Sequence, residues 1–172
     1  MPSRSSPVRR SAAAGPAELK PLDDMDWRVL RLLQNDARVS TAELARQVEL
    51  SPPGLQKRLR KLEESGVIER YVTLVNRESV GLDLLCFVHV TLAHHEPEYV
   101  SRFRDAMKLF PEVLECHHLT GEFDYLLKVV VENHKHLERF LVEKITRIPG
   151  VDRVRTSIVL REIKTSTALP LE

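Results

Sequence analysis

The chain has 172 residues, of which 26 are basic and 25 acidic, so its net charge is close to +1. Hydrophobic residues make up 42% and charged residues 30%, which is typical of a globular protein with one domain or two small ones. The near-neutral charge excludes a uniformly basic, histone-like protein. No apolar run approaches the ~20 residues that a membrane-spanning helix needs, so we expect no membrane partner.

Cysteine and glycine usage excludes two further classes. Cys86 and Cys116 provide neither a disulfide framework nor a CxxC pair, which favours the reducing cytoplasm. The six glycines are scattered, so there is no GxGxxG or P-loop motif for binding a nucleotide.

Residues 1–21 are rich in Ser, Arg, Ala and Pro and are predicted to be a disordered basic tail. No apolar stretch follows the early arginines, so the segment does not have the pattern of a secretory signal. Two interpretations stay open: Arg4, Arg9 and Arg10 contact DNA phosphates, or the tail has no role.

Residues 22–66 have a helical apolar period that predicts three helices. Asp23 is the expected N-cap of the first helix, and Ser40 with Glu43 forms an expected capping box at the second. Ser51 caps the third helix, whose first position is Pro52. The apolar stripes are Met25, Val29, Leu32 and Leu33, then Leu44, Ala45 and Val48, then Leu55, Leu59 and Leu62, and Gly66 ends the third helix.

The short connection between the second and third helices predicts a helix-turn-helix. Ala45 is the small residue that such a crossing needs, and Leu55 is the apolar residue that faces back from the second of the two helices. Glu49 stands in the turn where a glycine is usual, so we expect a left-handed residue that costs about 1 kcal/mol.

The exposed face of the third helix predicts DNA binding, because such a helix reads base edges in the major groove from its N-terminal half. Gln56 fits adenine, and Lys57 or Arg60 reaches guanine or phosphate. A run of charges is also compatible with an ordinary solvated helix face. The predicted DNA-binding residues are Ser51, Pro53, Gly54, Gln56, Lys57, Arg58, Arg60 and Lys61.

The second half of the chain predicts a ferredoxin-like βαββαβ domain over residues 83–165, joined by a linker over residues 67–82 and followed by a tail over residues 166–172. The overall fold class is therefore α+β. The expected strands and helices, in chain order, are strand 84–92, helix 98–110, strands 113–120 and 124–131, helix 135–148 and strand 151–161.

The expected strands are apolar on both faces, although helices in such a fold cover only one. Leu85 and Phe87 alternate with Cys86 and Val88 in the first strand. We expect the second face to pack against another subunit by two-fold symmetry, which makes a dimer with two DNA readers.

The turn over residues 120–124 has the chemistry to hold an amino acid. Gly121 permits an unusual backbone conformation, and the carboxylates of Glu122 and Asp124 lie near free backbone N–H groups. The ammonium of an amino-acid ligand would contact these side-chain carboxylates, and the ligand's own carboxylate would accept hydrogen bonds from the N–H groups. The same spacing also fits a plain β-hairpin turn.

At this point the chain resembles the Lrp/AsnC, or feast/famine, family of bacterial and archaeal transcription regulators. The matching stretches include Leu33-Gln-Asn-Asp-Ala-Arg38, Leu50-Ser-Pro-Pro53, Arg58-Leu-Arg-Lys-Leu-Glu63, Gly66-Val-Ile68, Pro111-Glu-Val113, Gly121-Glu-Phe-Asp-Tyr125 and Pro149-Gly-Val151. The resemblance covers about residues 22–171.

The resemblance implies a winged helix-turn-helix, a hinge strand around residues 67–76, and an effector and oligomerisation domain. Family members form dimers that assemble further, often into octamers, and bind an amino acid between effector domains. No other cofactor is implied, and the expected location is cytoplasmic and nucleoid-associated. The residues placed at the effector site are His118, Thr120, Gly121, Glu122, Phe123, Asp124 and Ser157.

Three alternatives remain beside a gene-specific regulator. A metal site at Cys116, His117 and His118 lacks the geometry for enough ligands along one strand, and Cys116 is expected to be a small buried hydrophobe. A sirohaem-decarboxylase-like enzyme would carry aromatic and His-rich segments that are missing here, so we expect no catalysis. A global nucleoid-organising protein is the third alternative.

Overall fold

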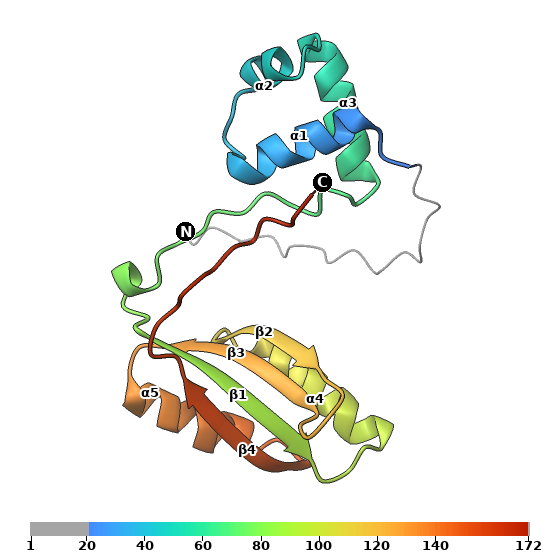
Figure 1. Cartoon of the computed structure of the whole chain (residues 1–172). Coiled ribbons are helices and arrows are strands. Elements are labelled where there is room, and N and C mark those ends of the chain that lie inside the picture. Colours follow the sequence, from blue (N-terminus) through green and yellow to red (C-terminus); the bar gives the residue numbers. More distant parts are fainter. Residues whose placement is uncertain (1–20, 172) are drawn as a thin grey trace, which may run out of the picture. The chain divides into compact units, whose positions relative to one another are not determined.

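The computed structural model describes residues 21–171, so the predicted basic tail lies outside the described residues except for Pro21. The chain divides into two compact units (Figure 1). The first contains the described residues up to 73 together with residues 165–171, and the second contains residues 74–164. No helix in the described part of the chain is long and apolar enough to cross a membrane.

The first unit is the predicted bundle of three helices: α1 (Asp24–Asn35), α2 (Thr41–Gln47) and α3 (Pro52–Glu64). The apolar stripes of the three helices pack together in a common core. Because the short α2 would be unstable alone, this packing rather than intrinsic propensity holds it helical. The buried apolar core residues are Val29, Leu30, Leu44, Ala45, Val48, Leu55 and Leu62.

The N-terminus of α2 forms only half of the predicted capping box. The Ser40 hydroxyl accepts a hydrogen bond from the Glu43 N–H at 3.1 Å. The Glu43 carboxylate does not return this bond, because it accepts instead from Arg46 and Gln47 on the next turn. These charge-assisted bonds lower the pKa of Glu43 to about 2.

Two residues adopt the predicted left-handed conformation. Glu49, in the turn between α2 and α3, has φ 58°, and Gly66, after α3, has φ 75°. Glu49 is the only non-glycine residue with positive φ among the described residues. The turn therefore carries strain of about 1 kcal/mol that a glycine would avoid.

The hinge strand predicted around residues 67–76 does not form within one chain. Val67 and Ile68 still pack on the helical core, but residues 69–76 have no regular secondary structure. A strand needs a neighbour to pair its backbone groups, and this segment pairs with none within the described residues. Four apolar side chains of this segment are consequently about half to three-quarters exposed: Tyr71, Val72, Leu74 and Val75.

The second unit has the predicted βαββαβ order. Its elements are a short 3-10 helix η1 (Glu78–Val80), β1 (Leu84–Leu92), α4 (Pro97–Leu109), β2 (Val113–His118), β3 (Tyr125–Val131), α5 (His134–Arg139), η2 (Phe140–Ile145) and β4 (Val151–Ile158). The strands form one antiparallel sheet in the order β2-β3-β1-β4. Three strands are shorter than predicted. The strand β2 ends at His118 rather than at residue 120, β3 begins at Tyr125 rather than at residue 124, and β4 ends at Ile158 rather than at residue 161.

The sheet has apolar residues on both faces, as predicted. Cys86, Val88 and Val90 of β1 point into a core shared with Phe103 of α4 and Phe140 of η2. On the opposite face, which we call the open face, Phe87, His89 and Leu126 remain partly exposed. The helices therefore cover one face only, and the open face keeps apolar surface available.

Cys116 is exposed, which corrects the prediction of a buried cysteine. It lies on β2, at the edge of the sheet, where only β3 flanks the strand. The position of β2 at the edge of the sheet therefore leaves Cys116 exposed.

The second predicted helix is divided into α5 and a wider π-helical segment, η2. The N–H of Thr146 donates to the carbonyl of Leu141, five residues earlier. His136 of α5 and Lys144 of η2 both contact Oε1 of the buried Glu112, at 3.4 and 2.5 Å. These contacts fasten the beginning of β2 to the helix.

Gly150 closes the connection into β4 and has φ 91°. A Cβ atom at this position would lie 2.8 Å from Cδ1 of Tyr99, whose side chain projects from the first turn of α4. Both the backbone conformation and the space therefore require glycine.

We expect Gly150→Ala to destabilise the protein by about 3 kcal/mol, because strain and a steric clash add together. Gly81→Ala is the matched control, since Gly81 has φ 78° but no atom within 4 Å of its Cβ position. It should cost only about 1 kcal/mol. Urea unfolding of both variants measures the difference, and equal effects of the two substitutions would show that the Tyr99 contact is irrelevant.

Candidate nucleic-acid interface and effector site

The predicted DNA-binding residues share an exposed face at and beyond the N-terminus of α3. Seven of the eight are exposed: Ser51, Pro53, Gly54, Gln56, Lys57, Arg60 and Lys61. Among the described residues, Lys57, Arg60 and Lys61 have no acidic partner within salt-bridge distance. Leu55 and Leu62 on the other side of the helix are buried and fix its rotation.

The first turn of α3 has a side-chain cap, and no side chain projects from it at position 54. The Ser51 hydroxyl caps the helix by accepting from the Gly54 N–H at 3.3 Å. A Cβ atom on residue 54 would lie 3.1 Å from that hydroxyl oxygen, so glycine gives the cap its room. Gly54 thus serves the helix end itself, besides leaving space for a close approach to DNA.

Arg58 has a different environment from the other predicted DNA-binding residues. One guanidinium nitrogen, Nη1, contacts the carboxylates of Asp23 at 2.7 Å and Asp26 at 2.5 Å. The Asp26 residue is 6% exposed, so this ion pair reaches the interior. The structure therefore makes Arg58 a positioning residue that joins α3 to the beginning of α1.

The two aspartates also cap α1, so the same carboxylates have two functions. Asp23 accepts from the Asp26 N–H at 2.8 Å, and Asp26 accepts from the Asp23 N–H at 3.2 Å, which completes a capping box. The hydrogen bond from Arg58 lowers the pKa of Asp23 below its usual value. Sequence reasoning found the cap but missed the ion pair, which joins residues more than 30 positions apart.

A second arginine that sequence reasoning missed holds the strained turn. Arg28 of α1 donates through Nη2 to the carbonyl of Gln47 at 2.8 Å, and the same nitrogen lies 4.0 Å from the Glu49 carboxylate. The end of α2 and the left-handed residue are therefore tied to α1. The angle between α2 and α3 depends on this turn.

The predicted effector turn connects β2 to β3. It is closed at its base by the Leu119 N–H, which donates to the Asp124 carbonyl at 2.8 Å. Gly121 at its centre has φ 129°. Within the described chain, the N–H groups of residues 120–123 donate no hydrogen bond, and Thr120, Gly121 and Glu122 are exposed. The turn therefore presents donors to an anion.

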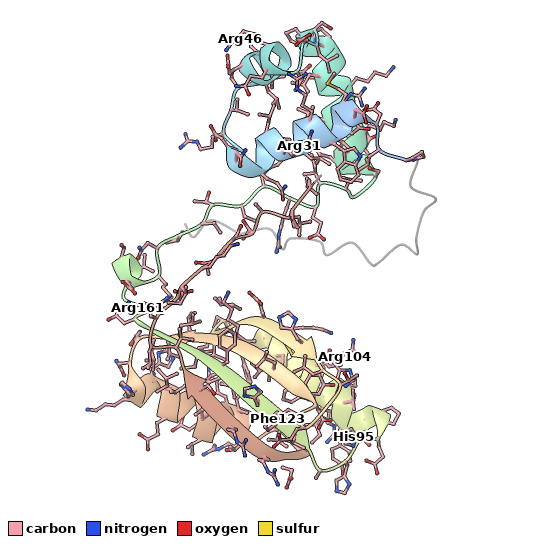
Figure 2. All side chains as sticks on the ribbon, in the orientation of Figure 1. Arg31, Arg46, His95, Arg104, Phe123 and Arg161 are labelled. Atoms are coloured by element: carbon pink, nitrogen blue, oxygen red, sulfur yellow. The ribbon has the colours of Figure 1, made fainter. Side chains whose placement is uncertain are left out.

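The Asp124 carboxylate is already engaged inside the unit. Oδ2 accepts from the Leu92 N–H at 2.7 Å, and Oδ1 lies 2.9 Å from Nε2 of His95, in the loop before α4 (Figure 2). Burial of the carboxyl acts to raise its pKa, but these two partners outweigh it and the pKa is lowered. Sequence reasoning missed this contact, which joins residues 29 positions apart.

The Phe123 side chain lies against the open face of the sheet. Its ring centroid is 4.7 Å from that of His89 on β1, and the Arg155 guanidinium of β4 lies 5.3 Å from the ring. Arg155 is also 3.8 Å from the Glu122 carboxylate. The exposed carboxylate and the aromatic ring of the turn are thus linked to β4 through one arginine.

The remaining predicted effector residues, His118 and Ser157, are not brought together within one chain. His118 is on the edge strand β2, where it stacks on Tyr125 with a centroid separation of 4.8 Å. Ser157 is on β4 at the opposite edge and pairs with Phe87, a residue of the open face. The register therefore places the two side chains on opposite faces of the sheet.

Comparison with known proteins identifies both units. A family model described as a winged helix-turn-helix DNA-binding domain matches residues 22–69. A second, described as the Lrp/AsnC ligand binding domain, matches residues 85–169. The leucine-responsive regulatory protein of Escherichia coli strain K12 is 39% identical over 153 residues, which cover 89% of this chain and 93% of that protein.

Solved structures agree with this. The crystal structure of a transcriptional regulator from Neisseria meningitidis in complex with L-methionine has a TM-score of 0.84 and 36% identity, and the match covers 88% of this chain and 97% of that one. A feast or famine regulatory protein from M. tuberculosis, complexed with L-methionine, has a TM-score of 0.76 and 32% identity, with coverages of 87% and 99%.

Two units, one a DNA-reading helix-turn-helix and the other a ligand-binding βαββαβ domain, define a DNA-binding transcription regulator. The chain belongs to the Lrp/AsnC family.

We expect Arg58→Ala to destabilise the first unit by about 2 kcal/mol, because it leaves the buried Asp26 without its partner. Lys57→Ala, one residue away on the exposed face, should leave the stability unchanged. Because the folded-state pKa of Asp23 is lowered, the ion pair stabilises the fold above the ordinary carboxyl pKa, and this stabilisation disappears as the pH falls through the lowered value. Thermal unfolding at pH 7 and pH 3 should therefore separate the two variants at neutral pH and less in acid; an equal stability of both variants at pH 7 would contradict the role of Arg58.

Proposed function

We propose that this regulator reads duplex DNA with the exposed face of α3, and that an amino acid bound at the Gly121 turn changes its assembly or its DNA affinity. The observation that supports DNA reading most directly is the exposure of Lys57, Arg60 and Lys61 without acidic partners among the described residues. Such cations attract phosphates and release bound counterions on contact.

The residues of this face divide by position along α3. Ser51, Pro53 and Gly54 are at its N-terminal end, where a recognition helix meets base edges. Gln56 has the donor and acceptor to pair with adenine, and Lys57 and Arg60 reach guanine or phosphate. Arg58 contributes indirectly, by holding the helix in place.

We expect Lys57→Glu to abolish specific DNA binding without changing the oligomer. The probe is a duplex enriched by the wild-type protein from a random-sequence library, and binding is followed by fluorescence anisotropy. Lys135→Glu is the matched control, because Lys135 on α5 is exposed and gives the same change of charge. Equal affinities of the two variants would contradict the assignment. Removal of a single phosphate contact, as in Arg60→Ala, should flatten the slope of log affinity against log salt by about 0.9.

Two observations support an amino-acid effector. The second unit matches a family of ligand-binding domains, and two similar regulators were solved with L-methionine. The turn offers free backbone N–H groups to a carboxylate, and Glu122 offers an exposed carboxylate to an ammonium. Because both oxygens of Asp124 are engaged, we propose that Asp124 positions the turn and that Glu122 contacts the ligand.

The effector site proposed here includes residues from more than one copy of the chain. His118 and Ser157 belong to opposite faces of the sheet, so both line one site only if a neighbouring copy supplies one of them. The apolar open face and the exposed apolar segment after α3 support a homodimer, and further assembly, up to an octamer, would bring turns of different dimers together. No cofactor besides the amino acid is proposed.

A regulator without catalytic activity is the function that we propose. The alternative is a sirohaem-decarboxylase-like enzyme, and a coloured tetrapyrrole that copurifies with the protein would support that alternative.

We expect Glu122→Gln to weaken binding of L-methionine by roughly tenfold, because a neutral amide replaces a charged partner of the ammonium. The thermal stability should not change, since Glu122 is exposed. Asp124→Asn should weaken binding and also lower the stability by about 1 kcal/mol, because it disturbs the bond to Leu92. Calorimetry and thermal unfolding measure both; loss of binding by Asp124→Asn alone, at unchanged stability, would instead assign the ammonium to Asp124.

A further inference from the structure

The last residues of the chain return to the DNA-reading unit. Gln34, near the end of α1, accepts a hydrogen bond through Oε1 from the Leu169 N–H at 2.6 Å and donates through Nε2 to the Leu169 carbonyl at 3.2 Å. The side-chain amide thus pairs with both polar groups of one residue, as a neighbouring strand would. Leu171, two residues further, packs against the core of the three helices.

Hydrogen bonds within residues 166–171 fix the backbone conformation of this segment. The Ser166 hydroxyl accepts from the Ala168 N–H at 3.1 Å, and the Leu171 N–H donates to the Leu169 carbonyl at 2.9 Å. The second bond closes a three-residue turn around Pro170, whose ring fixes φ near −65°. A peptide held in its bound shape loses less conformational entropy when it docks.

Two stretches of chain therefore reach the reading unit. One follows α3, where residues 69–76 have no regular structure, and the other is the segment of residues 165–171, which follows the second unit directly. Both stretches lack regular secondary structure, so either one alone would be an irregular tether. The second ends on α1, the helix whose Asp23 and Asp26 hold Arg58 of the recognition helix.

We propose that residues 165–171 form a strap that docks on α1 of the same chain and restricts the orientation of the DNA reader. The partner of this surface is thus a peptide of the chain itself, recognised through its main chain at Leu169 and its side chain at Leu171. In a dimer with two readers, a restricted reader loses less freedom when both readers contact one duplex. This consequence for DNA depends on the proposed dimer, whereas the docking does not.

Cross-linking tests the docking independently of DNA. Arg31→Cys and Leu169→Cys are introduced together in a Cys116→Ser background; Cys86 stays because it is buried. Arg31 is exposed and lies one turn before Gln34, so both hydrogen bonds of Gln34 survive. A short bis-maleimide should link the pair within one chain, giving a product of monomer mass in a denaturing gel. Arg46→Cys on α2 with Leu169→Cys is the control and should not react in this way.

A product of dimer mass would show that the strap docks on the partner's reader, and no product would show that it does not dock; either result overturns the proposal. Gln34→Ala combined with Leu171→Ser should abolish the cross-link, since the two substitutions remove both the hydrogen bonds and the apolar anchor.

The same double variant tests the effect on DNA. Affinity for the library-selected duplex should fall by roughly tenfold, while affinity for a duplex cut to one half-site stays unchanged, because only the two-reader complex benefits from restriction. Asn35→Ala with Leu160→Ser is the matched control, since Asn35 is exposed and Leu160 is 98% exposed. An equal fall in affinity for both duplexes, or none for either, would overturn the role of the strap.

Discussion

The contact of Arg58 with Asp23 and Asp26 is the interaction on which the DNA-reading unit depends. It joins the beginning of α1 to the middle of α3, and the same carboxylates form the cap of α1. One cation of the basic run in α3 is thereby directed inward, while the neighbouring cations stay exposed. The basic run of α3 therefore supplies both an internal ion pair and exposed cations, and the sign of the charge does not distinguish the two. The geometry does, because Arg58 alone lies beside carboxylates of another helix.

A second constraint comes from the sheet of the effector unit. Helices α4 and α5 cover one face, and the open face carries Phe87, His89 and Leu126 with the ring of Phe123 laid across its end. Exposed apolar area of this kind favours association. The turn that we assign to the effector is continuous with this face through Phe123 and Arg155, so a ligand at the turn and a second copy on the face would contact the same few residues. Effector binding and assembly would then be coupled without a long pathway.

Much of this organisation could be predicted from the sequence, because it depends on local patterns. Apolar stripes indicated the three helices, Ser51 and Pro52 indicated the beginning of α3, and alternation indicated the βαββαβ order. The predictions that needed correction depend on contacts between distant residues. Cys116 is exposed because its strand lies at the edge of the sheet, and the hinge strand needs a pairing partner. The division of α5 from η2 is a change of helical register that hardly alters the spacing of apolar residues. The ion pair of Arg58 and the contact of Gln34 with Leu169 span 32 and 135 positions, and no local pattern indicates either.

The attachment of the C-terminal segment has a consequence for how such chains diverge. Both hydrogen bonds between Gln34 and residue 169 involve the main chain of Leu169, whose side chain is 67% exposed. Any residue other than proline presents the same N–H and carbonyl, so substitutions at position 169 leave this contact intact. The constraint is placed on the length of the segment and on the residues at positions 170 and 171. Two regulators with dissimilar sequences in this segment would then share one attachment, which a sequence alignment would overlook and a comparison of structures would detect.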